Sequence, residues 1–389
     1  MPTRAGWALA GLGAGTIILG RLFGWLELFV IGAGLLALTA FAVLLVRFRS
    51  LSLGVRRTVR PARLHVGESA RVELAVANRS RLSTPVLTLR DPVAGTVGAR
   101  VRLAPLRPGK ERQAAYRLPT SRRGILHVGP LEALRSDPLG LARRRLTVSG
   151  TVEVVVYPRV DRIMSPPGGK EQPTAVRNRQ MVRASRRDTF RGLREYVAGD
   201  DLRLVHWRSS ARTGDLVVRL DEQPRPQATA VVLDLRRSAH AGLSLERAVS
   251  VAASVVLAGR RAGQEVVLAS TDGTAMLLRP GESAAAVLEY LAVARLSTAG
   301  SLRSTLSGAI GVLGAGSVVL VTGRAVPSEL ASLASSRQGF LIFAVATDGT
   351  VPPAGTSMPG VRVVDGGGEE RFVASWEQAM VTATREGAA

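Results

Sequence analysis

Two long apolar runs occupy the start of the chain. Gly6 to Gly20 carries no charge, Arg21 follows, and Leu22 to Val46 contains Glu27 as its one charged residue. A helix needs about 20 apolar residues to cross the hydrocarbon core of a bilayer. The second run reaches this length, and the first reaches it if Arg21 extends toward the interface from a tight turn. The pattern predicts a transmembrane helical hairpin within residues 1–48.

A secretory signal peptide is the rival interpretation of this segment. It is disfavoured because the longer apolar run that follows at once would stop transfer, and a single span stays open as a weaker alternative. Arginines flank the hairpin: Arg4 precedes it, and Arg47, Arg49, Arg56, Arg57 and Arg60 follow it. Because cytoplasmic flanks of membrane helices are rich in Lys and Arg, we expect the N-terminus and the body of the chain in the cytoplasm.

Residues 49–158 alternate between apolar and polar positions. Val72, Leu74 and Val76 are each separated by one residue of lower hydropathy, which is the period of a strand with one buried face. Similar short runs occur at Pro85–Leu89, Val101–Leu103, Ile125–Val128 and Val152–Tyr157. Turn residues separate these runs, as at Pro108-Gly109. Several short strands at this spacing predict an antiparallel β-sandwich.

Residues 227–389 change to buried-type strands that alternate with helical patterns. The strand-like runs are Thr229–Leu235, Glu265–Ser270, Ser317–Thr322 and Phe340–Ala346. The helical patterns are Leu243–Arg261, Ser283–Leu296, Leu302–Leu313, Pro327–Arg337 and about Glu369–Thr382, with Ser244 as a possible N-cap. Continuous apolar runs suit strands buried on both faces of a parallel sheet. We therefore expect a multi-domain α+β membrane protein that ends in a doubly wound α/β domain, with residues 159–226 as a linking region.

The composition of the chain limits the cross-links, metal sites and charged ligands that can be expected. The chain has no cysteine, which excludes disulfides and thiolate ligands. Its four histidines lie far apart in sequence, so a histidine-rich metal site is not expected. The formal net charge of +22 comes almost entirely from arginines that are scattered along the chain. Scattered arginine does not favour nucleic acid, although binding of nucleic acid or anionic lipid by an Arg-rich surface stays open as an alternative.

The linking region contains one dense group of charged and aromatic residues. Its members are Arg194, Glu195, Tyr196, Gly199, Asp200, Asp201, Arg203, Trp207 and Arg212. Arginines beside carboxylates can form charge-assisted hydrogen bonds that fix geometry. The group is interpreted either as a structural clasp on the α/β domain or as a docking surface for a partner protein. Catalysis is not expected, because no nucleophile–base pair can be named.

A second candidate lies where the first strand of the α/β domain ends. Asp234 and, four residues on, Ser238 stand at the edge where open parallel sheets bind ligands. Together with the order of elements, they resemble a von Willebrand factor A domain, which implies Mg²⁺ bound by an Asp-x-Ser-x-Ser loop, a Thr and a second Asp. Arg236 stands at the third loop position, and the later strand ends at Thr322 without that Asp. No metal is therefore expected, with Asp234 and Ser238 kept as degenerate candidates and Mg²⁺-dependent ligand binding as an alternative.

The spacing from Arg194 to Arg212 resembles the signature of a bacterial family known as domain of unknown function 58. The resemblance extends over the chain: two apolar helices, a β domain that contains Asp137-Pro138-Leu139-Gly140-Leu141, the signature and an A-type domain. It implies a partner, because members of this family look like companions of MoxR-type AAA+ ATPases and of other membrane proteins. The implied role is a non-enzymatic adaptor or scaffold at the bacterial plasma membrane. The chain itself lacks a Gly-x-x-x-x-Gly-Lys-Ser/Thr loop.

Overall fold

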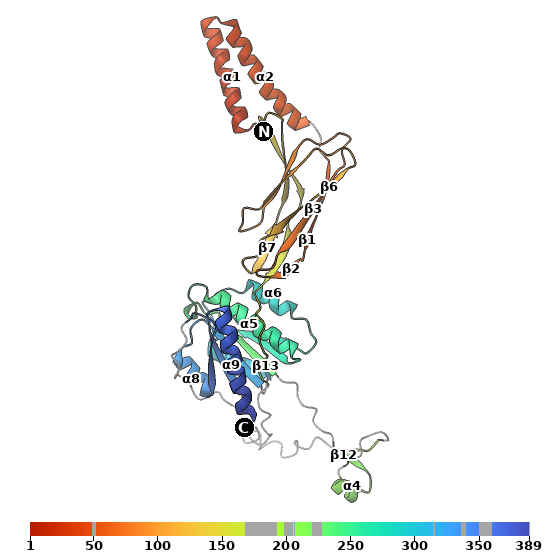
Figure 1. The fold of residues 1–389 in the computed structure, drawn as a ribbon, viewed down its shortest axis with the longest axis vertical. Helices are drawn as coiled ribbons and strands as arrows, with labels where there is room; N and C mark the ends of the chain where they lie inside the picture. Colours follow the sequence, from red (N-terminus) through yellow and green to blue (C-terminus); the bar gives the residue numbers. More distant parts are fainter. Residues whose placement is uncertain are drawn as a thin grey trace. The chain divides into compact units, whose positions relative to one another are not determined.

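In a computed structural model, the chain divides into two compact units, Met1–Arg159 and Val160–Ala389. The structure describes residues 1–48, 52–167, 193–197, 205, 207–219, 228–313, 316–335, 340–349 and 360–388. The two predicted apolar helices, the strand-rich region and the α/β domain are all present (Figure 1).

The first unit begins with two antiparallel helices, α1 (Arg4–Phe23) and α2 (Leu26–Phe48), which are long and apolar enough to cross a membrane. Gly24 ends α1 in a left-handed conformation with φ of 71°, which a glycine adopts without steric cost. Gly13 and Gly32 face each other, and a Cβ at Gly32 would lie 2.6 Å from the Gly13 carbonyl oxygen. Glycines at this point let the two backbones approach closely, as small residues do in membrane helix pairs.

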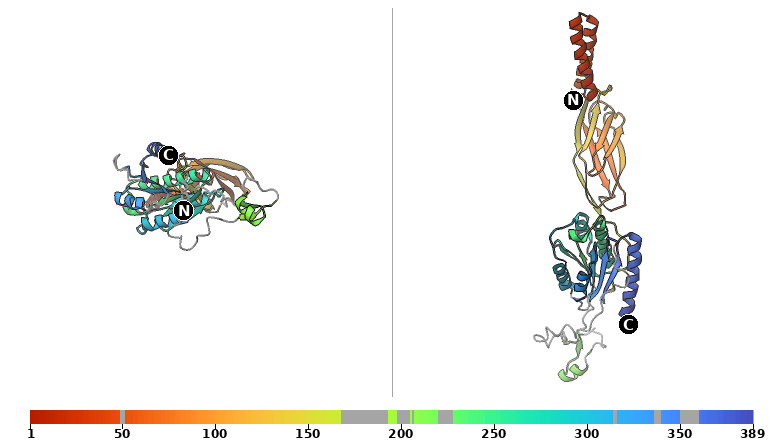
Figure 2. Two further views of the ribbon diagram at one scale, coloured as in Figure 1. Left: turned by 90° about the horizontal axis from the view of Figure 1, so that it is seen from below. Right: turned by 90° about the vertical axis from the view of Figure 1, so that its left-hand side faces the viewer.

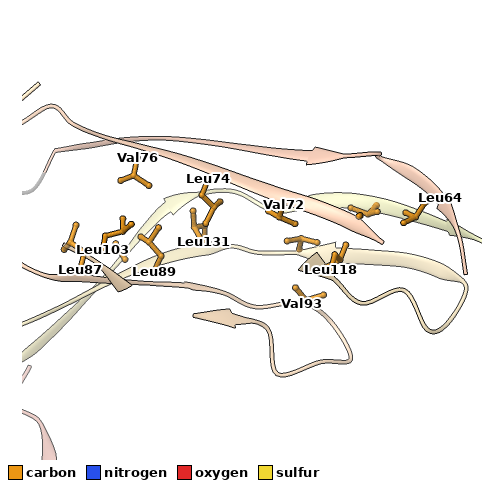
Figure 3. Close-up of a cluster of buried hydrophobic side chains, with 14 of the residues drawn as sticks. Leu64, Val72, Leu74, Val76, Leu87, Leu89, Val93, Leu103, Leu118 and Leu131 are labelled. Atoms are coloured by element: carbon orange, nitrogen blue, oxygen red, sulfur yellow. The ribbon is translucent and has the colours of Figure 1, made fainter. Parts of the chain in front are cut away.

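The rest of the first unit consists of strands around one apolar core. The strands are β1 (Leu53–Arg60), β2 (Arg63–His65), β3 (Ala70–Asn78), β4 (Leu87–Asp91), β5 (Ala99–Leu103), β6 (Glu111–Leu118), β7 (Gly124–Val128), β8 (Leu131–Ser136), β9 (Arg143–Ser149) and β10 (Val152–Tyr157). They form sheets in the orders β1-β3-β6, β2-β10-β7 and β5-β4-β8-β9. All pairings are antiparallel except that of β2 with β10. Leu74 of β3 shares this core with Leu87 of β4 and Leu131 of β8, which belong to another sheet (Figure 3).

The helical hairpin is fixed to the loop between β8 and β9. The Thr3 amide donates to the Leu141 carbonyl at 2.8 Å, and the Arg144 guanidinium donates to the Arg47 carbonyl at 2.8 Å. Asp137 holds the loop itself by accepting from the amides of Leu139 and Ala142. The Asp-Pro-Leu-Gly-Leu motif therefore forms the seat on which the open end of the hairpin rests.

The second unit contains a six-stranded mixed sheet with helices on both faces (Figures 1 and 2). The strands are β13 (Ala228–Leu233), β14 (Glu265–Ser270), β15 (Ala275–Leu278), β16 (Gly316–Thr322), β17 (Phe340–Ala346) and β18 (Val361–Asp365), in the order β15-β14-β13-β16-β17-β18. The helices are α5 (Ser244–Arg261), α6 (Ala285–Val293), α7 (Leu302–Leu313), α8 (Pro327–Ser335) and α9 (Glu369–Ala388). All strands run parallel except β15.

The two faces of this sheet are covered by different helices. Alternate residues of β13 and β16, such as Val232 and Leu320, pack against α7 and α8. On the other face, the Phe343 ring lies 5.6 Å from the Trp376 ring of α9, and α5 packs against β13 and β14. The expected N-cap role of Ser244 is wrong. Ser244 is the first residue of α5, and its hydroxyl accepts from the Ala241 amide in the preceding turn.

Candidate functional site

The carboxyl ends of β13 and β16 meet at one edge of the sheet, and Asp234 lies there fully buried. Its backbone amide donates to the Val321 carbonyl at 2.9 Å, which places the carboxylate beside the end of β16. The His240 ring nitrogen Nε2 lies 2.6 Å from the Asp234 carbonyl oxygen. These contacts hold the loop after β13 in a fixed position. The loop lies at the edge of the sheet where the alternation of strands and helices predicts a ligand site.

Arg236 supplies a positive charge directly to this buried carboxylate. Its Nε and one terminal nitrogen bond the two Asp234 oxygens at 3.0 and 2.8 Å, and its terminal nitrogens also bond both Glu329 oxygens at 2.8 and 3.0 Å. The hydrogen bonds that Arg236 donates to Asp234, and then those to Glu329, raise the pKa of Arg236 further above its ordinary range. The guanidinium therefore bridges the strand β13 edge and the first turn of α8 as a permanent cation.

The residues at this edge do not fit a bound Mg²⁺ ion. Asp234 Oδ1 accepts from the Arg236 amide and Nε, and Oδ2 accepts from an Arg236 terminal nitrogen and from the Thr322 hydroxyl at 3.0 Å. A carboxylate offers about four acceptor positions, and all of them are in use. Ser238 is exposed in the short 3₁₀ helix Arg237–Ala239. Within the described ranges, no group of three or more His, Asp or Glu side chains could hold a metal ion.

We expect the thermal stability of the protein to be insensitive to chelation. Because the guanidinium of Arg236 neutralises Asp234 without an ion, about 5 mM EDTA or about 5 mM Mg²⁺ should change the unfolding midpoint by less than about 1 °C. A ligand that binds the folded protein and is present at 100 times its Kd would instead raise the free energy of unfolding by about 2.7 kcal/mol. Differential scanning fluorimetry of dialysed protein measures this. A stabilisation that rises with Mg²⁺ concentration and is reversed by EDTA would contradict the assignment.

The signature region is described in three pieces that pack together. Strand β11 (Leu193–Glu195) pairs antiparallel with β12 (Val217–Arg219), and helix α4 (Trp207–Thr213) lies between them in the sequence. The Tyr196 amide donates to the Leu216 carbonyl at 2.8 Å, and the Val217 amide donates to the Ser210 hydroxyl at 2.9 Å. The helix is therefore tied to the two-stranded ribbon.

Large apolar side chains are exposed on this small assembly. Trp207 exposes 65% of its surface, Val197 63% and Leu216 41%. Arg208 and Arg212, on the same helix as Trp207, are exposed as well. Aromatic residues and arginines dominate the residues that contribute most to protein–protein affinity, and contiguous exposed apolar patches mark interaction sites. We call Val197, Trp207, Arg208, Arg212 and Leu216 the Trp207 surface.

The predicted signature residues are only partly located. Tyr196, Trp207 and Arg212 lie on the assembly just described, and Arg194 and Glu195 belong to β11. Gly199, Asp200, Asp201 and Arg203 lie outside the described residues, so the predicted charge network stays a prediction. Sequence reasoning missed Glu329 at the sheet edge and the exposed Val197 and Leu216. Glu329 follows Pro327 in the first turn of a helix after β16, which is a signal that could have pointed to it.

Residues 192–324 match a family described as "Protein of unknown function DUF58". The matched segment runs from β11 and the Trp207 surface through β13 to the end of β16, so it contains both candidate sites except Glu329. The resemblance found in the sequence is confirmed over these residues. The comparison with curated proteins found no match.

Solved structures show weak similarity. The CARDB domain of the PF1109 protein from Pyrococcus furiosus, solved in complex with di-metal ions, is 19% identical with a TM-score of 0.23, covering 28% of this chain and 96% of that chain. A β-glucosidase from Listeria innocua in complex with glucose is 16% identical with a TM-score of 0.19, covering 27% and 16%. The alkylpurine DNA glycosylase AlkC from Pseudomonas fluorescens, bound to DNA, is 15% identical with a TM-score of 0.20, covering 36% and 42%. At these scores the similarities carry no argument about function.

Proposed function

Starting from the match to the DUF58 family, we propose that the protein is a membrane-anchored adaptor that binds partner proteins and has no catalytic activity of its own. The helical hairpin anchors the chain in the bacterial plasma membrane, and the strand-rich domain after it and the second unit lie in the cytoplasm. The main partner is a MoxR-type AAA+ ATPase, and other membrane proteins join the complex. This partner follows from the family resemblance. The chain itself has no Gly-x-x-x-x-Gly-Lys-Ser/Thr loop, which agrees with an adaptor that works beside a separate ATPase.

The exposure of Trp207 is the observation that supports this proposal most. Trp207 presents 65% of its surface to solvent, an area that a bound partner would bury. Arg208 and Arg212, exposed on the same helix, suit a partner surface that carries carboxylates. The ribbon of β11 and β12 holds the helix that presents these side chains, so the surface is available before binding. This observation favours the docking interpretation of the signature over the clasp interpretation.

We further propose that the α/β unit is a degenerate von Willebrand factor A-like domain and that β1–β10 form a β-sandwich. In this view the A-like domain works without metal, because Arg236 takes the place that a cation would need beside Asp234. The Mg²⁺-dependent alternative loses support from the same contacts. Binding of nucleic acid has no described feature in its favour.

The experiment that tests the proposal is capture of partners from detergent-solubilised native membranes with the tagged full chain, in the presence of a non-hydrolysable ATP analogue. The expected result is recovery of an AAA+ ATPase, identified by mass spectrometry and in stoichiometric yield. Recovery of membrane lipids or chaperones without such an ATPase would contradict the proposed partner.

Orientation in the membrane gives a separate prediction. Because Arg4 and Arg47 flank the hairpin and one arginine and one glutamate lie at its turn, we expect both ends of the hairpin on the cytoplasmic side. A green fluorescent protein fused after Ala389 should fluoresce, and alkaline phosphatase fused at the same place should be inactive. Fusion of each reporter to the turn after Phe23 is the control and should give the reverse pattern. Active phosphatase at the C-terminus would contradict the orientation.

A further inference from the structure

A groove runs along the surface of the helical hairpin near its seat on the β8–β9 loop. It has a volume of about 370 Å³ and an almost entirely apolar wall. Its lining residues are Pro2, Trp7, Ala10, Leu36, Thr39, Ala40, Val43, Leu44 and Arg47. Small residues of both helices, Ala10 and Ala40, leave the space that larger side chains would fill.

The length of the groove corresponds to one leaflet of a bilayer. Leu36 and Arg47 lie eleven residues apart on α2, which is about 16 Å along a helix that rises 1.5 Å per residue. Half of a typical hydrocarbon core measures about 15 Å. An acyl chain that begins at the level of Arg47 therefore ends near Leu36, at the depth where the two leaflets meet.

The end of the groove at Arg47 is strongly basic. Arg47 and Arg4 are exposed in the last turn of α2 and the first turn of α1. Arg144, which bonds the Arg47 carbonyl, and its exposed neighbour Arg143 add two further guanidinium groups from β9. Asp137 at this end is committed to the amides of its own loop. Charge and groove together match a molecule with an apolar tail and an anionic head.

Two exposed apolar residues mark the Arg47 end of the groove as the end that lies at the membrane–water interface. Trp7 exposes 67% of its surface in the second turn of α1, and Leu139 exposes 63% at the tip of the seating loop. Tryptophan is enriched at the level of lipid headgroups. These residues place the boundary between hydrocarbon and headgroups at the level of Arg47, where a lipid phosphate would lie.

We propose that this groove binds an anionic phospholipid, with one acyl chain against Ala10 and Ala40 and the phosphate against Arg47 and Arg144. The inference rests on the proposed function only in requiring that the hairpin spans a membrane. Bound lipid would fill the groove along α1 and α2 and so stabilise the pairing of the two helices.

Native mass spectrometry of the full chain, released from micelles that contain equal amounts of phosphatidylglycerol and phosphatidylcholine, tests the site. The wild type should retain phosphatidylglycerol in preference to phosphatidylcholine, and Arg47→Gln should reduce this preference about fivefold, since one arginine near an anionic surface contributes about 1 kcal/mol. Ala40→Phe, which fills the groove, should reduce retention of both lipids. Arg21→Gln, at the other end of the hairpin, is the matched control and should leave the preference unchanged.

Two results would overturn the site: equal retention of both lipids by the wild type, or the same loss in Arg21→Gln as in Arg47→Gln. Arg47→Gln keeps the backbone carbonyl that Arg144 uses, so it tests the charge even if Ala40→Phe does not fold. Carbonate extraction of membranes distinguishes a protein that lacks the lipid site from a protein whose hairpin does not span the membrane. A chain that stays in the membrane without lipid preference contradicts the lipid site alone, whereas a chain released by carbonate contradicts the anchored adaptor itself.

Discussion

Replacement of Arg236 with alanine should lower the free energy of unfolding of the α/β unit by about 3 kcal/mol. The substitution leaves the carboxylate of Asp234 fully buried without the guanidinium that neutralises it. Removal of one partner of a buried ion pair costs about 3–5 kcal/mol, and the 21% exposure of the Arg236 side chain favours the lower end of that range. Hydrogen exchange of peptides from β13 and β16, followed by mass spectrometry, measures this loss within the unit concerned.

Arg237→Ala is the matched control for this prediction. Arg237 is the next residue in the chain and is exposed, so its loss should change the free energy of unfolding by less than about 0.5 kcal/mol. Arg236→Ala combined with Asp234→Asn should recover part of the loss, because the neutral amide removes the uncompensated charge. If Arg236→Ala lowered the free energy of unfolding no more than Arg237→Ala, the stabilising role of the Arg236 guanidinium beside Asp234 would be refuted.

Replacement of Trp207 with alanine should weaken binding of the partner by about 30-fold or more. Truncation of a central interface tryptophan commonly costs 2 kcal/mol or more, and 1.4 kcal/mol corresponds to tenfold in Kd. Because Trp207 is 65% exposed in the free chain, its removal should leave folding intact, and circular dichroism should not change. Surface plasmon resonance with the purified ATPase and the immobilised full chain gives the Kd of each variant.

Leu243→Ala is the control for Trp207→Ala. Leu243 is a large apolar residue that exposes 81% of its surface in the same unit, in the turn before α5. Its removal should change the Kd by less than about threefold if the signature, and not the sheet edge, is the docking surface. The opposite order of effects would move the partner to the carboxyl edge of the sheet near Arg236.

Periodicity predicted most elements with a strong apolar face and missed several of the others. Helix α7 and strands β10, β14 and β17 begin and end at the expected residues, and strands β13 and β16 lie within one or two residues of expectation. By contrast, β6, β8 and β9 were among the strands that were not expected. Strand β8 buries alternate residues, but its third buried position is an arginine, Arg135. Strand β6 buries one residue fully, Leu118, and β9 begins with three exposed arginines. A strand with one buried position gives no alternation to detect.

The candidate sites depend on contacts between residues far apart in sequence, which periodicity does not report. Position 236 could be recognised as unsuited to a metal, since an arginine cannot be a ligand. That its guanidinium would join Asp234 to a carboxylate 93 residues later required the packing of α8 against the end of the sheet. In the same way, Arg57 and Tyr116 both bond the buried Asp91 from different strands. Side chains that meet in this way are found only when the register of the sheets is known.

Docking of an AAA+ ATPase on the signature is tested most directly by one comparison. Tagged wild type and a folded Arg203→Ala, Trp207→Ala double variant are used side by side to capture partners from solubilised native membranes with a bound ATP analogue. The wild type is expected to recover the ATPase, and the double variant is expected to recover none. Equal recovery by the two proteins, or no ATPase with the wild type, would contradict it.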